Sequence, residues 1–178
     1  MRRRVFLGAL AGASVAGTAY VYTLRAPDVI YIATATNVVD RMLKLAEVSS
    51  KDIVYDLGCG DGRFVITAAR QFGARGIGID IDPARIKEAR ELAQRTNTAD
   101  RVRFVEADLF KTDFREATVV TLFLAPALNL KLRPKLLADL KPGTRVVSHR
   151  FDMGDWKPEK VEHVDATPIY LWRIPARS

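Results

Sequence analysis

The stretch Val54-Tyr55-Asp56-Leu57-Gly58-Cys59-Gly60-Asp61-Gly62-Arg63 decides the fold of this chain. The apolar run at residues 53–55 predicts a short buried strand, and residues 64–70 predict a helix. The three glycines between them let the backbone approach a ligand closely, because glycine lacks Cβ and accepts a positive φ. The first turn of the helix also presents N–H groups that have no partner within the helix. A strand, a glycine turn and a helix in this order predict a ligand site.

Two acidic residues narrow the kind of ligand. Asp56 lies at the strand end before the first glycine, and Asp80 ends the next apolar run, 22 positions after Gly58 (80 − 58). A carboxylate about 20 residues after a glycine turn is where a nucleotide ribose is held. The ordinary dinucleotide fold is one interpretation, but it uses G-x-G-x-x-G where residues 58–62 show G-x-G-x-G, and it gives no reason for Asp56. A turn that binds nothing is the other alternative.

Three motifs together resemble the class I S-adenosyl-L-methionine (SAM)-dependent methyltransferases. They are D-L-G-C-G-D-G-R at 56–63, G-I-D at 78–80 and E-A-D-L at 106–109. The resemblance covers roughly residues 29–175. It implies an α/β fold with a Rossmann-like doubly wound sheet, mostly parallel, with an antiparallel C-terminal strand.

The same resemblance implies SAM as the cofactor and assigns its contacts. Asp56 is expected near the cationic methionine end, Asp80 at the ribose and Asp108 near the adenine amine. An Asx-turn is the alternative role for Asp108. The motifs add further positions to the predicted cofactor site: Gly58, Cys59, Gly60, Ile81 and Leu109.

The lead-in Tyr31-Ile32-Ala33-Thr34-Ala35 carries a narrower resemblance. It is similar to the Y-V-P-T-P of the protein-lysine methyltransferases related to the ATP synthase c-subunit lysine methyltransferase, with alanine in place of both prolines. This implies that Tyr31 and Thr34 cover the cofactor, with ordinary packing as the alternative, and that the acceptor is a protein lysine. A small-molecule acceptor and a non-catalytic, membrane-tethered SAM-binding module remain alternatives.

The acceptor side is expected where the apolar strand 118–124 ends, because open α/β sheets place their chemistry at the carboxyl edge. Leu124 and Pro126 are the predicted substrate-side residues. Residues 124–127 lack the N-P-P-Y of methyltransferases that act on planar amines, which argues against adenine or cytosine amines. The polar and aromatic loop 148–156 supplies His149 and Asp152 as catalytic candidates, although a lysine acceptor needs no dedicated base. A structural hydrogen bond is the alternative for His149.

The composition of the chain indicates which kinds of partner it can bind. The chain has 178 residues, 48% of them hydrophobic, which predicts one domain with a real core. Its net charge of +7 includes four arginines within residues 1–25, so the remainder carries 24 basic against 21 acidic residues, or +3. We therefore expect no nucleic-acid partner. Cys59, His149 and His163 show no metal-ligand spacing, so no metal is expected.

Residues 1–25 are predicted to be a separate segment, with the methyltransferase domain in 26–178. The 20 residues from Val5 to Leu24 carry no charge, and Arg3-Arg4-Val5-Phe6-Leu7 resembles a twin-arginine export signal. A cleaved signal and a membrane anchor are both consistent with this pattern. We therefore predict a membrane-associated or exported protein, and the sequence does not decide on which side of the membrane the domain lies. Its acceptor could be a membrane protein.

The remaining periodicity predicts alternating strands and helices. Asn37 and Asp40 suggest an N-cap pair, and Asp82-Pro83 a helix start. The last helix is either continuous or broken and restarted at Pro134. The predicted helices are 37–46, 64–70, 82–95 and 128–140; the predicted strands are 53–55, 74–79, 102–106, 118–124 and 145–148, followed by a closing pair at 161–164 and 168–174.

Overall fold

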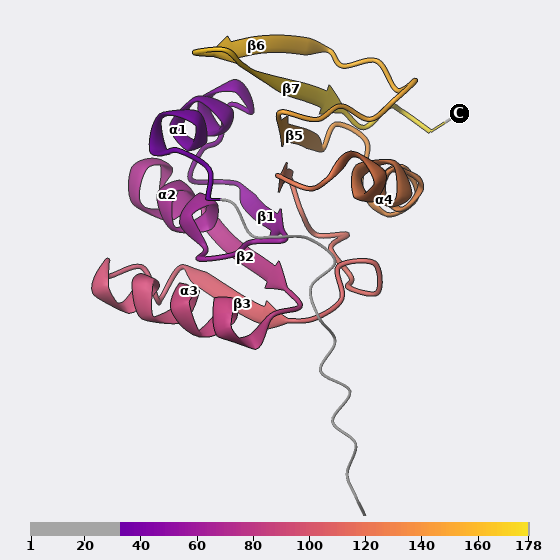
Figure 1. Cartoon of the computed structure of the whole chain (residues 1–178). Helices are drawn as coiled ribbons and strands as arrows, with labels where there is room; N and C mark the ends of the chain where they lie inside the picture. The colour runs from indigo at the N-terminus through magenta and orange to yellow at the C-terminus, as the bar shows by residue number, and fades with distance from the viewer. Residues whose placement is uncertain (1–32, 178) are drawn as a thin grey trace, which may run out of the picture.

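The computed structural model describes residues 33–177, which form one sheet with helices on both faces (Figure 1). Every strand and helix predicted from the sequence is present, within a few residues of the expected bounds. In chain order the elements are α1 (Thr36–Leu45), β1 (Ile53–Leu57), α2 (Arg63–Phe72), β2 (Arg75–Asp80), α3 (Pro83–Arg95), β3 (Val102–Glu106), β4 (Val119–Leu122), α4 (Pro126–Asp139), β5 (Arg145–His149), β6 (Lys160–Val164) and β7 (Thr167–Arg173).

The strand order is β3-β2-β1-β4-β5-β7-β6. Strands β1 to β5 are parallel, and β7 is antiparallel to both of its neighbours, β5 and β6. This confirms the predicted doubly wound, mostly parallel sheet. The chain runs outward from β1 to β3 and then returns past β1 to β4, so the direction of winding reverses between β1 and β4. Ligands of open α/β sheets bind outside the carboxyl ends of the strands at such a point.

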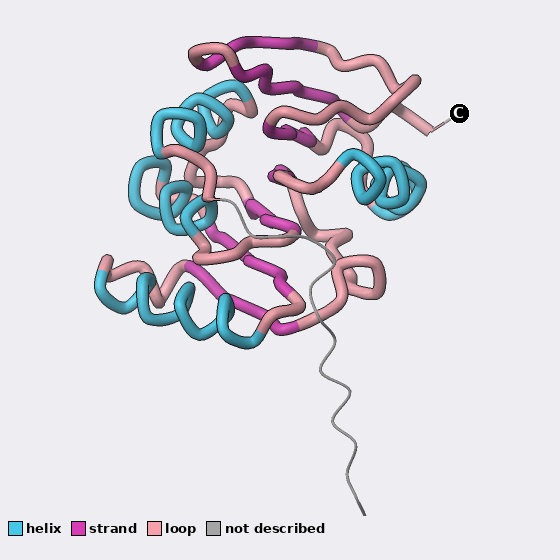
Figure 2. The backbone as a smooth tube through the Cα atoms, in the orientation of Figure 1, coloured by secondary structure: helices cyan, strands magenta, loops and turns pink. Residues whose placement is uncertain are grey.

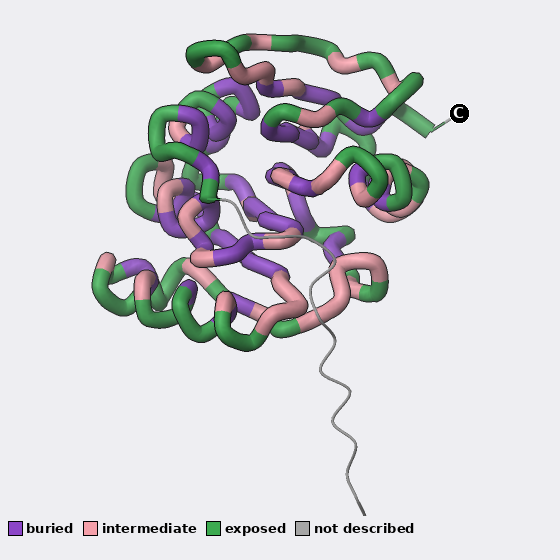
Figure 3. Tube along the Cα trace, viewed as in Figure 1, coloured by how far each residue is buried: buried purple, intermediate pink, exposed green. Residues whose placement is uncertain are grey.

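Two apolar layers hold the sheet between the helices. Alternate residues of a strand face opposite sides, so Val54 joins the layer beneath α1, α2 and α3, while Tyr55 joins the layer beneath α4. Figure 3 shows the central strands buried and the outer surface of α3 exposed. Figure 2 shows the long loops after β3 and after β5, in contrast to the short turns elsewhere in the sheet.

The structure decides one open helix detail and shows that one predicted detail is wrong. Helix α4 runs through Pro134 without a break, because Leu132 and Leu136 on either side are both fully buried and packing holds the helix together. Helix α1 begins at Thr36, one residue before the predicted cap. Its N-cap is Ala35, whose side chain makes no capping bond. The predicted cap of α3 is confirmed, because Asp82 accepts a hydrogen bond from Ala84 N at 2.8 Å.

The predicted N-terminal segment 1–25 and Tyr31 lie outside the described residues. Within 33–177, no helix combines the length and the apolar character needed to cross a bilayer.

Candidate active site

The glycine turn after β1 is fastened to the carboxyl end of β2. The backbone N–H groups of Gly58 and Cys59 both donate to the carbonyl of Ile79, at 2.8 and 2.9 Å. Gly60 N donates to Asp80 Oδ2 at 2.8 Å, and Asp82 N donates to Asp80 Oδ1 at 3.0 Å. Asp80 therefore lies beside the glycine turn, as the ribose prediction requires, and it also holds that turn in place.

Close packing explains why glycine is needed in the turn. Gly58 has φ +85°, and a Cβ there would lie 2.8 Å from Leu124 Cδ2. Gly62 has φ +78° and is the N-cap of α2, and a Cβ there would lie 2.4 Å from the Phe104 ring. The turn thus places backbone without side chains at the point where β1 and β4 end. A nucleoside cofactor needs such a cradle.

Asp56 is a buried carboxyl group at the end of β1. Its residue is 2% exposed, and Thr121 Oγ1 donates to its Oδ1 at 2.7 Å. Burial raises its pKa to about 7, although the Thr121 hydrogen bond opposes this. A cation bound nearby would favour the ionised form. The site therefore suits a ligand with a cationic amino group, as SAM has.

The lead-in segment is tied to both sides of the site through Thr34, which is buried. Arg63 donates from Nη1 to the carbonyl of Thr34, and its Nε donates to Asp61 Oδ1 in the glycine turn at 2.9 Å. On the other side, Thr34 Oγ1 and His149 Nδ1 share a hydrogen bond of 3.3 Å. Thr34 thus lies between the glycine turn and the end of β5, and its contact with the cofactor stays a prediction.

The two catalytic candidates differ in their surroundings. His149 ends β5 and is 8% exposed, and burial, followed by the charge of Arg150, lowers its pKa. It is therefore neutral at pH 7. Asp152 is exposed, and its Oδ1 accepts a hydrogen bond from Gly154 N at 3.0 Å, closing a turn. Within the described part of the lead-in segment, residues 33–35, Thr34 bonds the His149 side chain.

The other predicted residues lie along the same edge of the sheet. Asp108 follows β3, and its Oδ1 accepts from Phe110 N at 3.0 Å, so it forms the Asx-turn weighed as an alternative. The Cys59 thiol is buried, with its pKa raised by burial, so it points into the core. The remaining members are Ile81 and Leu109, both half-buried, Leu124, which is buried, and Pro126, which is exposed. Their ligand contacts stay predictions.

Several residues at the site escaped the sequence reasoning. Thr121 interrupts an apolar strand and bonds Asp56, and Arg63 ends the glycine motif. Asn129 is a polar residue at a fully buried position of α4. A polar side chain inside an apolar run was the available signal for Thr121 and Asn129, because a buried polar group needs a partner. Phe123 gave no signal, since it reads as one more apolar residue of its strand.

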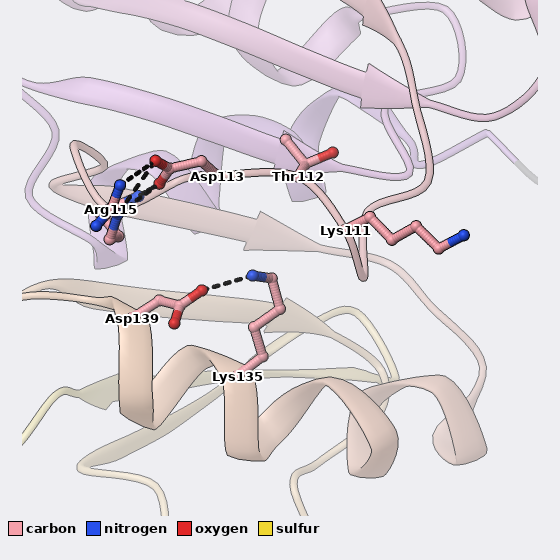
Figure 4. A pocket seen from close by; sticks show the side chains of 6 residues that line it. All are labelled: Lys111, Thr112, Asp113, Arg115, Lys135 and Asp139. Carbon is pink, nitrogen blue, oxygen red and sulfur yellow. Dashed lines mark hydrogen bonds and ion pairs between the residues drawn. The ribbon is translucent and has the colours of Figure 1, made fainter.

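A separate pocket of about 270 Å³ lies between the loop after β3 and the C-terminal half of α4 (Figure 4). Four of its charged groups form ion pairs with each other, Arg115 with Asp113 at 2.6 Å and Lys135 with Asp139 at 2.5 Å. The glycine turn and the ends of β4 and β5 do not contribute to it. We assign it no part in the chemistry. In the part of the chain that the structure describes, no group of three or more His, Cys, Asp or Glu side chains could hold a metal ion.

The reversal of winding between β1 and β4, the antiparallel β7 and the three acidic strand ends around a glycine turn define a class I SAM-dependent methyltransferase. The family can be stated more narrowly. A family model described as the ANTKMT methyltransferase domain matches residues 56–160, and the chain belongs to this family. The protein is therefore a methyltransferase with SAM as its cofactor.

Three relatives place it among characterised proteins. A protein-lysine N-methyltransferase from Saccharolobus islandicus is 48% identical over 78% of this chain and 87% of its own length. The ATP synthase c-subunit lysine N-methyltransferase of Xenopus laevis is 33% identical over 79% of this chain, and the chain spans 62% of that protein. The crystal structure of an RNA methyltransferase from Salinibacter ruber with S-adenosyl-L-homocysteine is 53% identical, with a TM-score of 0.81, over 83% of this chain and 96% of that one.

Proposed function

We propose that this methyltransferase transfers the methyl group of SAM to the ε-amine of a protein lysine. The observation that carries the proposal is the 48% identity to a protein-lysine N-methyltransferase along 87% of that relative's length. The acceptor edge supports it, because residues 124–127 read Leu-Ala-Pro-Ala and lack the side chains that grip a planar base amine. That edge is also apolar, since none of the side chains at 124–127 is polar, and an apolar edge suits an alkyl amine.

The chain's own residues suit the cofactor well. We assign the ribose to Asp80, the cationic amino group to the neighbourhood of Asp56, and the adenine amine to Asp108. The backbone around Gly58 and Gly60 would lie against the cofactor, since both have a positive φ in the turn that follows β1 and neither carries a side chain. When bound, SAM supplies an electrophilic methyl carbon on a sulfonium.

The protein must then align the amine and keep it unprotonated. The lone pair of a neutral lysine nitrogen forms the new C–N bond while the C–S bond breaks, with its electrons going to sulfur. An apolar edge beside a cation favours the neutral amine. Proximity and orientation can lower the activation barrier by up to about 11 kcal/mol. The product nitrogen then loses its proton to water, so the step needs no dedicated base.

RNA is the second candidate acceptor, because the Salinibacter ruber protein at 53% identity is described as an RNA methyltransferase. The two candidates make different labelled products. The full chain would be incubated with tritiated SAM and either membrane proteins or total RNA of the source organism. We expect label that protease removes and ribonuclease does not, and methyl-lysine after acid hydrolysis of the protein.

An Asp80→Ala variant serves as the control and should transfer no label. Label in nucleotides would establish the RNA acceptor and exclude the lysine proposal. Label only in material that passes a 3-kDa filter would point to a small-molecule acceptor. A chain that binds S-adenosyl-L-homocysteine but labels nothing would favour the non-catalytic module.

We also infer that residues 1–25 tether the protein to a membrane or direct its export. The uncharged run at 5–24 behind three arginines supports this. Fractionation of cells that express the full chain, compared with cells that express residues 26–178, tests it. Equal amounts of both in the soluble fraction would contradict the tether.

A further inference from the structure

Three aromatic rings gather at the carboxyl ends of β4 and β5. Leu122 of β4 pairs with Leu57 of β1 and with Ser148 of β5, so Phe123 and His149 come next, level with Gly58 of the glycine turn. The rings of Phe123 and His149 have centroids 4.2 Å apart. The Phe151 ring stacks on Phe123 at 6.3 Å with an interplanar angle of 15°. We call Phe123, His149 and Phe151 the aromatic wall.

An uncommon turn returns Phe151 to this wall. Phe151 N donates to the carbonyl of His149 at 2.8 Å, across Arg150 with φ +69°. A γ-turn with positive φ is rare and strained, and a long side chain at positive φ is an outlier. Strain of this kind persists only where the surroundings impose it, and it concentrates at functional sites. Without the turn, the chain would carry Phe151 away from Phe123.

Asn129 of α4 supplies much of that constraint. Its Nδ2 donates to the carbonyls of Phe151 and Asp152 at 3.2 and 3.3 Å, and Ser148 Oγ donates to the Phe151 carbonyl at 2.7 Å. Asn129 is fully buried. It therefore acts on the site only by positioning the aromatic wall.

The chemistry of the wall favours one class of group. Aromatic faces attract cations, and quaternary and methylated ammonium groups are the ones they hold best. Phe123 and Phe151 are each partly exposed at the edge where the acceptor must enter. Arg150 lies over one side of the Phe151 ring, with its Cζ 5.9 Å from the centroid. A cation therefore already uses one aromatic face of the loop.

We propose that the aromatic wall is the acceptor subsite and that it binds the methylated ammonium form of the lysine side chain. This inference rests on the proposed lysine acceptor and deepens it. The first two transfers each leave a protonated N-methylamine, which must lose that proton to water before its lone pair can attack a further methyl carbon. A third transfer leaves a trimethylammonium group, which has no proton to lose and ends the sequence. By holding the methylammonium between transfers, the wall allows one lysine to receive more than one methyl group, each from a new SAM molecule.

A binding experiment tests the wall directly. The full chain, saturated with S-adenosyl-L-homocysteine, is titrated with N-acetyl-trimethyl-lysine methylamide and with its uncharged analogue, in which tert-butyl replaces trimethylammonium. NMR of labelled phenylalanine rings follows both titrations. We expect the charged probe to bind about 3- to 10-fold more tightly and to shift Phe123 and Phe151. Equal affinity for both probes, or unshifted rings, would overturn the subsite.

Matched variants distinguish a loss of the aromatic wall from a general loss of stability. Phe151→Leu should lose most of the preference for the charged probe, and Phe151→Tyr, which keeps an aromatic face, should retain it. Phe72→Leu at the end of α2, away from the glycine turn, should behave as wild type. Asn129→Ala should weaken the charged probe while cofactor affinity is unchanged. Preference retained in Phe151→Leu would contradict the wall.

Mass spectrometry of the labelled acceptor protein tests the consequence for the reaction. We expect di- and trimethyl-lysine from wild type and a shift towards monomethyl-lysine from Phe151→Leu. Label in RNA would overturn the proposed function and this inference together. Lysine label with the same methylation states in Phe151→Leu, or monomethyl-lysine alone from wild type, would overturn this inference only.

Discussion

At the scale of single residues, two carboxyl groups about the glycine turn have opposite surroundings. Asp80 accepts backbone hydrogen bonds on both of its oxygens. Asp56 is buried with one hydroxyl partner, and burial raises its pKa to about 7. The first group suits a neutral sugar hydroxyl as donor, and the second gains from a nearby cation. If both carboxyl groups contact the cofactor as proposed, the pair would distinguish its two ends.

Replacing Asp80 by alanine should remove cofactor binding without unfolding the domain. A charged hydrogen-bond partner contributes about 1.5–3 kcal/mol for each bond, so the loss of even one bond should lower the affinity for S-adenosyl-L-homocysteine at least about tenfold. Calorimetric titration measures this, with Asp100→Ala on an exposed turn as the control. Unchanged affinity in Asp80→Ala would sink the site assignment.

The pKa of Asp56 predicts how stability varies with pH. Below the ordinary pKa of 3.8, the carboxyl is protonated in both the folded and unfolded states. Between 3.8 and about 7, the folded state retains a proton that the unfolded state has lost, so this group's contribution to stability falls as pH rises. The total loss is on the order of 4 kcal/mol. Asp56→Asn should remove this pH dependence.

Urea unfolding of the ligand-free protein at pH 5 and pH 8 measures that difference. The wild type should lose more stability than Asp56→Asn between the two values. Parallel losses in both proteins would show that Asp56 titrates at an ordinary pKa.

At the scale of elements, the glycine turn and α2 depend on one residue at their junction. Gly62 has φ +78° and no room for a Cβ, whereas Gly143 has φ +84° with nothing within 4 Å of a Cβ. Gly62→Ala should destabilise the domain by about 3 kcal/mol, through backbone strain and overlap with Phe104. Gly143→Ala carries only the strain, about 1 kcal/mol.

Thermal unfolding of both variants separates the two effects. Equal losses would mean that the Phe104 ring moves aside, and that close packing at Gly62 does not matter.

The elements were predictable because their signals are local. Apolar periodicity marked every strand and helix, and Asp82-Pro83 marked the start of α3. The contacts that build the acceptor side are not local. Thr34 and His149 are hydrogen-bonded although they lie 115 positions apart in the sequence. The turn at Arg150 has a positive φ, but no glycine in the sequence indicates it. Asp56 and Asp80 were found through their motif, whereas Phe151 becomes visible only once β4 and β5 lie side by side.

At the scale of the whole molecule, the two edges of the sheet have different tasks. Asp52, at the amino edge just before β1, accepts from Thr118 Oγ1 at 2.7 Å and pairs with Arg145 of β5. Burial by itself raises the pKa of Asp52, but the hydrogen bonds from Thr118 and Ser49, together with Arg145, lower it overall. Asp52 therefore adds stability above pH 3.8, and this is lost as pH falls through its lowered pKa.

Arg145→Met should accordingly destabilise the protein by about 3 kcal/mol, because it leaves Asp52 buried without its cation. The affinity for S-adenosyl-L-homocysteine should stay within about twofold, since the cofactor site is at the opposite edge. Unfolding and calorimetry on one preparation measure both. A large loss of affinity in a folded variant would show that the two edges are coupled.

The hydrogen bonds of Asp80 have a further consequence for the thermodynamics of cofactor capture. Each oxygen already accepts one backbone N–H, and a carboxylate has about four acceptor positions, so each oxygen keeps capacity for another donor. The side chain is therefore immobilised before any ligand arrives. Arresting a free side chain on association typically costs about 0.5–1.5 kcal/mol. Here the Asp80 side chain loses that conformational entropy during folding. Cofactor binding should therefore have a correspondingly smaller entropic penalty.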